Sequence, residues 1–177
     1  MIDLIYCTPQ EELGFHKMLN IKQFNIIEGI SEEKNREAVE NKQVDILLAP
    51  ERVGKKDRLN QRDSGLNDVL CKFARDNDVA IGFSFADLLN SKFRAVLLGR
   101  MMQNVRLCRK YKVRMVLGSF AKNSWEMRAP NDLLALGQVL GMAPKEAMIA
   151  LNFTKKRQGI KIKKEKNQLL SQSRRYL

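Results

Sequence analysis

The sequence is poor in the residues that metal-dependent hydrolases and nucleotide-binding proteins use. It contains one histidine, His16, so a site built from several histidine and aspartate ligands has few candidates. No glycine-rich phosphate loop occurs, and the turn after the first expected strand reads Cys7-Thr8-Pro9-Gln10. A nucleophilic pair of Cys7 with His16 stays open, but it has no sequence signature. The sequence therefore offers few candidate catalytic residues.

Cysteines and long apolar runs are also scarce. The three cysteines, Cys7, Cys71 and Cys108, are far apart in apolar surroundings, which favours buried thiols over a disulfide or metal framework. No apolar run approaches the roughly 18 residues of a membrane-spanning helix, and the first residues do not have the pattern of a signal peptide. We expect a soluble cytoplasmic protein with no membrane partner.

Acidic residues are missing from one long stretch. Residues 88–125 contain nine lysines and arginines and no aspartate or glutamate. Because like charges repel at helix and loop distances, such a stretch is favourable beside a polyanion. Phe93, Leu97, Met101 and Val105 recur in it at helical spacing, which predicts a folded, charged surface.

The charge of the whole chain is strongly basic and unevenly spread. The 177 residues include 32 Lys and Arg against 20 Asp and Glu, a net charge of +12. Residues 51–128 carry a net +9 and residues 153–177 a net +8, whereas residues 1–50 carry −4 and residues 129–152 carry −1. We predict one domain at 1–153 and a basic extension at 154–177, with nucleic acid as the favoured partner. The extension either orders on RNA or only increases solubility.

Strand-like and helix-like segments alternate along the chain. We expect strands at 2–7, 24–28, 44–49, 79–85 and 114–120. Expected helices run from Thr8-Pro9 to Leu19, over 32–42 behind Ser31, from Leu66 behind Asp63 or Ser64, and over 91–111, 131–140 and 144–152. Five strand-then-helix units predict parallel pairing and an α/β fold. The sheet is either open and doubly wound or a small or incomplete barrel, since a full barrel takes about 250 residues.

The helix expected at 91–111 offers two kinds of basic residue. Arg106, Arg109 and Lys110 share its outer face with Lys92, whereas Arg94 and Arg100 lie at the margin of its apolar stripe. A guanidinium held at such a margin is suited to binding phosphate. The alternative interpretation is a solvated face without a ligand.

The segment 62–67 also has two interpretations. Asp63-Ser64-Gly65 is a common cap and turn before a helix. Arg62, placed before a helix N-terminus whose N–H groups attract phosphate, would instead form an anion site.

Four blocks of sequence together resemble one known family. The blocks are Arg62-Asp63-Ser64-Gly65-Leu66-Asn67, Val79 to Phe85, Met102-Gln103-Asn104 with Leu107 to Val113, and Arg128 to Leu133. In order and spacing they resemble protein component 3 of archaeal ribonuclease P, over residues 2 to about 153, a family related to a subunit of the eukaryotic enzyme.

The resemblance implies a TIM-barrel-like fold related to the polymerase and histidinol phosphatase hydrolases, without their catalytic machinery. It implies a subunit of the ribonucleoprotein that removes 5′ leaders from precursor tRNA, in which the RNA is the catalyst. On this view the chain has no catalytic residue, metal or cofactor of its own, and Mg²⁺ serves the RNA. The expected partners are the ribonuclease P RNA, at least one other protein subunit and, indirectly, precursor tRNA.

The resemblance also ranks candidate RNA-binding residues. The basic positions of the matching blocks are Arg62, Arg94, Lys110, Lys112 and Arg128, and the helical projection adds Arg100. Weaker candidates are Arg106, Arg109, Lys155, Lys156 and Arg157. Ala49-Pro50-Glu51 departs from relatives that carry histidine before the proline, which leaves a metal role doubtful. The alternative function is a free-standing metal-dependent phosphoesterase or nuclease on the same barrel.

Overall fold

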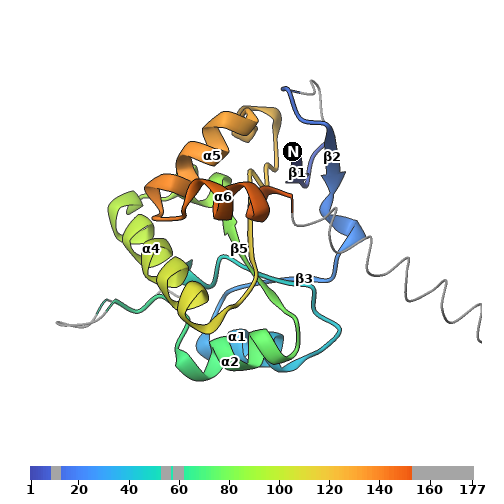
Figure 1. Ribbon diagram of the computed structural model, residues 1–177. Helices are drawn as coiled ribbons and strands as arrows, with labels where there is room; N and C mark the ends of the chain where they lie inside the picture. Colours follow the sequence, from blue (N-terminus) through green and yellow to red (C-terminus); the bar gives the residue numbers. More distant parts are fainter. Residues whose placement is uncertain (9–12, 53–56, 58–61, 153–177) are drawn as a thin grey trace, which may run out of the picture.

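In the part of the chain that the structure describes, six short parallel strands form two sheets. Helices pack against the larger sheet, and β1 and β2 lie at one side of the protein (Figure 1). The computed structural model describes residues 1–8, 13–52, 57 and 62–152. Strand β1 (Ile2–Ile5) pairs with β2 (Lys17–Asn20), and β3 (Ile26–Glu28), β4 (Ile46–Leu48), β5 (Ala80–Ser84) and β6 (Met115–Gly118) form a second sheet in that order. Every ladder is parallel.

Three backbone hydrogen bonds join the sheets at the ends of β1 and β6. The amide of Phe120 donates to the carbonyl of Leu4 at 2.9 Å, and the amides of Tyr6 and Cys7 donate to the carbonyl of Ala121 at 2.9 and 3.2 Å. The expectation of parallel strands in an α/β fold is confirmed. Within the described ranges no ladder joins β2 to β3, so closure into a barrel stays a prediction.

The helices begin and end where local chemistry favours it. They are α1 (Glu32–Glu40), α2 (Asp68–Asp76), α3 (Phe85–Asn90), α4 (Arg94–Tyr111), α5 (Pro130–Val139) and α6 (Pro144–Leu151), with short 3₁₀ turns η1 (Ile21–Gln23), η2 (Pro50–Arg52) and η3 (Ser124–Glu126). Ser31 caps α1 by accepting from the amide of Lys34, as expected. Proline begins both α5 and α6, where its missing N–H costs nothing. Among the described residues, no helix is long and apolar enough to cross a membrane.

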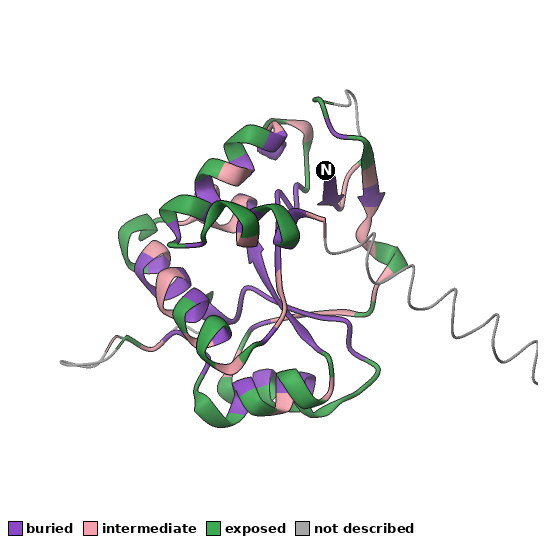
Figure 2. Cartoon of the chain, in the orientation of Figure 1, coloured by how far each residue is buried: buried purple, intermediate pink, exposed green. Residues whose placement is uncertain are grey.

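The central strands are buried on both faces (Figure 2). Alternation along them places their side chains in two of the core clusters. One face supplies Leu4, Leu19, Ile46, Leu48 and Val116 to an inner cluster, and the opposite face packs against the helices. Cys71 and Cys108 are buried free thiols, as the sequence predicts, and Cys7 is half-buried.

Three local expectations were wrong. In place of a helix reaching Leu19 there is strand β2, because Leu19 pairs with Leu4 and fills the inner cluster; residues 9–12 lie outside the described ranges. The N-cap of α2 is Asn67, which accepts from the amide of Leu70, and neither Asp63 nor Ser64 caps this helix. Strand β5 leads directly into α3, which Ser84 caps and which the sequence pattern did not predict.

Candidate nucleic-acid interface

Arg100, expected to bind an anion from α4, is instead engaged inside the protein. Only 7% of its surface is exposed. Its Nε and Nη2 atoms donate to Asp57 Oδ1 at 2.8 and 2.7 Å, and Nη1 donates to the carbonyl of Glu51 at 3.3 Å. Contact of Arg100 with RNA stays a prediction. The geometry supports a structural role, in which Arg100 holds Asp57 and the backbone of Glu51 against α4.

Arg109 has a structural role as well. Its Nε and Nη2 donate to the two carboxylate oxygens of Glu146 at 2.9 and 2.6 Å, and Nη2 also donates to the carbonyl of Gly141 at 2.7 Å. These hydrogen bonds hold the pKa of Glu146 below its ordinary value. They connect α4 to the turn between α5 and α6.

Arg94 and Arg128 differ from this pair, because backbone carbonyls hold their guanidinium groups. Arg94 Nη2 donates to the carbonyl of Leu89 at 2.6 Å. Arg128 Nη1 donates to the carbonyls of Trp125 and Met127 at 2.8 and 2.6 Å, and its guanidinium lies 4.7 Å from the centre of the Phe85 ring. Neither arginine has a carboxylate within ion-pairing distance in the described part of the chain. No described carboxylate therefore offsets the charge of either arginine, and the carbonyl groups orient both guanidinium groups.

The other basic candidates on α4 and at its C-terminus are also exposed. Arg106 and Lys112 are exposed, and Lys112 ends the helix in the left-handed conformation at φ 57°. The ammonium of Lys110 lies 3.9 Å from Asp68 Oδ2, a loose and solvated pairing. Lys155, Lys156 and Arg157 fall outside the described residues, as does the extension at 154–177.

Arg62 rests on α4, with its guanidinium against Gly99. A β carbon at Gly99 would lie 1.7 Å from Arg62 Nη1, so the guanidinium occupies the space that this glycine leaves open. Gln103 Nε2 donates to the carbonyl of Arg62 at 3.2 Å. Helix α2 begins at Asp68, and a site that combines Arg62 with the N-terminus of that helix stays a prediction. Arg62 is exposed beside α4.

A buried polar junction explains why the 62–67 block has its sequence. Asn104 Nδ2 donates to Glu51 Oε2 and to the carbonyl of Ser64, both at 3.0 Å. Burial raises the pKa of Glu51 to about 8, so this carboxyl group is mostly protonated at neutral pH. A β carbon at Gly65 would lie 2.0 Å from the carbonyl oxygen of Pro50. The junction therefore positions the 50–52 turn, the 64–65 turn and α4 together.

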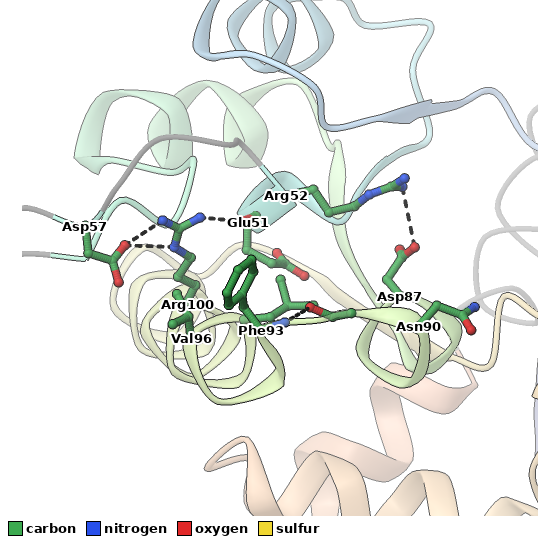
Figure 3. A pocket seen from close by; sticks show the side chains of 10 residues that line it. Glu51, Arg52, Asp57, Asp87, Asn90, Phe93, Val96 and Arg100 are labelled. Atoms are coloured by element: carbon green, nitrogen blue, oxygen red, sulfur yellow. Dashed lines mark hydrogen bonds and ion pairs between the residues drawn. The ribbon is translucent and has the colours of Figure 1, made fainter.

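A groove of about 810 Å³ opens at the carboxyl ends of β4 and β5 (Figure 3). Arg52 crosses it, with Nη1 at 2.9 Å from Glu28 Oε2 and at 3.5 Å from Asp87 Oδ1. Phe93 and Val96 line the side formed by α4. Within the described ranges, no three His, Cys, Asp or Glu side chains are placed to hold a metal ion.

Two aromatic residues at this surface were not predicted to be exposed: helical spacing placed Phe93 in the apolar stripe of the helix, and it made no prediction for Trp125. Phe93 is 75% exposed and Trp125 is 87% exposed. A usable signal was present, because Phe93 stands between Lys92 and Arg94, and Trp125 stands between Lys122 and Arg128. Aromatic residues interleaved with basic ones are typical of surfaces that bind single-stranded nucleic acid.

These features define an α/β protein of parallel strands with a cationic helical face. Residues 3–162 match the model of the family "RNase P subunit p30", and the chain belongs to that family. It is 41% identical over 138 residues to ribonuclease P protein component 3 of Methanosarcina acetivorans, covering 77% of this chain and 54% of that one. Against the protein of the same name from Thermococcus kodakarensis, identity is 37% over 139 residues, covering 77% and 60%.

A solved structure supports the same assignment. The chain is similar to a chain in the cryo-EM structure of archaeal ribonuclease P with mature tRNA, at a TM-score of 0.66 and 25% identity. The similarity covers 88% of this chain and 78% of that one. The chain spans about half to two thirds of the length of its curated relatives, 54% and 63% for the two Methanosarcina proteins from M. acetivorans and M. barkeri.

Proposed function

We propose that this chain is a protein subunit of ribonuclease P that binds the RNA of the enzyme and supports its removal of 5′ leaders from precursor tRNA. Family membership and the similarity to a chain of the archaeal complex support the assignment. The observation that carries RNA binding is the pair Arg94 and Arg128, whose charges are fixed by carbonyl groups and not neutralised by described carboxylates. Rigid guanidinium groups suit phosphate recognition.

The finer parts of the proposal follow from the same assignment. The strands would belong to a TIM-barrel-like fold related to the polymerase and histidinol phosphatase hydrolases. The chain would contact the RNA and at least one other protein subunit, and precursor tRNA only indirectly. Mg²⁺ would serve the RNA, which is the catalyst, and the assembly would work in the cytoplasm.

Omission of this chain is expected to lower precursor-tRNA cleavage by an enzyme reconstituted from the RNA and the remaining protein subunits. The physical reason is that cationic contacts offset the repulsion between RNA segments that must approach each other. The measurement is the cleavage rate with and without the chain at fixed Mg²⁺. Cleavage of precursor tRNA by the isolated chain, abolished by a chelator, would instead identify a free-standing nuclease.

Replacing both Arg94 and Arg128 by alanine is expected to weaken RNA binding about tenfold or more. Each lost phosphate contact should also reduce the slope of log K against log salt by about 0.7 to 0.9. Filter binding of the ribonuclease P RNA at several salt concentrations measures both quantities.

The matched control for this pair is Arg109→Ala. It removes one positive charge from the same helix, but from a side chain bound to Glu146 and Gly141. We expect it to change RNA affinity little. Equal losses per charge in Arg109→Ala and in the double variant would show that total charge, and not these two positions, sets affinity.

A further inference from the structure

Helix α3 is bordered by the two most exposed of the large apolar side chains that the structure describes, Phe93 and Trp125. Asn90, the last residue of α3, donates from Nδ2 to Glu126 Oε1 at 2.8 Å. This hydrogen bond holds the turn that carries Trp125 against the end of α3. Phe93 follows Asn90 by three residues in the chain. Exposed aromatic rings offer flat apolar faces on which a ligand can stack.

The two anchored arginines lie at the same helix. Arg94 reaches back to the carbonyl of Leu89 within α3, and Arg128 stacks on Phe85, the first residue of α3. Their carbonyl partners use only part of the donor set of each guanidinium. Because a guanidinium has five N–H donors, each arginine retains donors for an anionic ligand.

The groove beside Phe93 adds groups that suit the edge of a base. Asn90 and Ser91 line it, and Val96 and Leu97 supply an apolar wall (Figure 3). An amide and a hydroxyl offer both donors and acceptors. The surface thus combines aromatic faces, fixed cations and neutral polar groups in one place.

We propose that this α3 surface, formed by Phe93, Arg94, Trp125 and Arg128, binds an unpaired segment of RNA. The two rings stack against bases and the two guanidinium groups contact phosphates. The ligand is single-stranded, because in a duplex the base faces are already stacked and inaccessible to side chains. The inference rests on the proposed function and specifies the kind of RNA that this part of the chain binds.

Charge favours RNA over a protein partner. The stretch 88–125 carries nine basic residues and no acidic one, and Arg94 and Arg128 have no described carboxylate partner. A protein covering Phe93 and Trp125 would need to supply acidic groups to both arginines. An RNA segment supplies one phosphate for every base, which matches aromatic and cationic side chains placed side by side.

The protein itself provides a local probe, since Trp125 is its single tryptophan and is 87% exposed. We expect a single-stranded oligouridylate of about 12 nucleotides to quench its fluorescence saturably, and an RNA duplex of equal length to leave it nearly unchanged. A labelled oligouridylate that binds without changing Trp125 fluorescence would overturn the stacking proposal while RNA binding stands. Failure of the full ribonuclease P RNA to bind the chain would overturn the proposed function.

Variants separate stacking from charge. Phe93→Leu and Trp125→Leu keep an apolar side chain but remove the aromatic face, and each should lower affinity for labelled oligouridylate about tenfold. Neither removes a phosphate contact, so the salt dependence should stay as in the unaltered protein. Ile149→Ala, at an exposed apolar residue of α6, is the control and should bind normally. Unchanged RNA affinity in both leucine variants would overturn the proposal and assign the rings to a protein partner.

Discussion

Glu51→Gln is expected to raise the free energy of unfolding at pH 8 by on the order of 4 kcal/mol. The Glu51 side chain is fully buried, and burial raises its pKa from 4.5 to about 8. Between these values the folded protein holds a proton that the unfolded chain has lost. The contribution of Glu51 to stability therefore falls as pH rises from about 4.5 to about 8, and this contribution is constant on either side of that window.

Glutamine should remove this pH dependence without disturbing the junction. Its carbonyl can accept from Asn104 Nδ2, as Glu51 Oε2 does. Its amide adds donors to a junction in which Ser64 Oγ and Asn104 Oδ1 are buried and have no hydrogen bond to the described residues. Urea unfolding at a series of pH values measures the effect.

A second buried carboxyl group, Glu126, provides the control for Glu51. Its burial raises the pKa, but hydrogen bonds from the Lys122 amide and from Asn90 outweigh burial, and the net pKa is lowered. Glu126→Gln should therefore destabilise the protein at neutral pH and leave the decline toward pH 8 intact. Parallel stability profiles for Glu51→Gln and the unaltered protein above pH 4.5 would contradict the prediction.

Gly65→Ala is expected to cost at least about 3 kcal/mol, a large part of the total stability of a domain of this size. Gly65 has φ +72°, where an L residue is strained by about 1 to 2 kcal/mol. Its β carbon would also lie 2.0 Å from the carbonyl oxygen of Pro50, which is backbone and cannot rotate away. The turns must separate, breaking the 3.1 Å hydrogen bond from Asn35 Nδ2 to the Gly65 carbonyl.

Gly141→Ala is the matched control for Gly65→Ala. Gly141 has φ +91°, yet a β carbon there would meet nothing within 4 Å. Alanine at this position should lower stability only by the backbone strain, about 1 kcal/mol. Thermal unfolding of both variants isolates the contact with Pro50, and equal losses would show that this contact does not matter.

Much of the fold was predictable because it depends on local periodicity and capping. Ser31 before α1, Pro144 at the start of α6 and the apolar stripe of α4 each specify an element from nearby residues. Strand β2 was not predictable in this way. Its four residues are a strand because β1 needs a parallel partner, an interaction between segments some 15 residues apart in the chain.

The candidate site, too, was predictable from the sequence only in part. The acid-free stretch and the family blocks identified the basic candidates, since both are properties of the linear order of residues. The helical projection grouped Arg94 with Arg100, although Arg94 is exposed and Arg100 is buried against Asp57. A periodicity argument places a residue on a helix face, but it does not show which loop covers that face.

By itself the sequence determined the excess of positive charge, its concentration in residues 88–125, the alternation of strands and helices, and the family. The tertiary structure decided which of those charges are available. Arg100 pairs with Asp57, 43 residues earlier in the sequence, and Arg109 pairs with Glu146, 37 residues later. The described hydrogen-bond partners of Arg94 and Arg128 are carbonyl groups. Packing determines which distant residues pair. It leaves the guanidinium groups of Arg94 and Arg128 and the exposed rings of Phe93 and Trp125 together at α3.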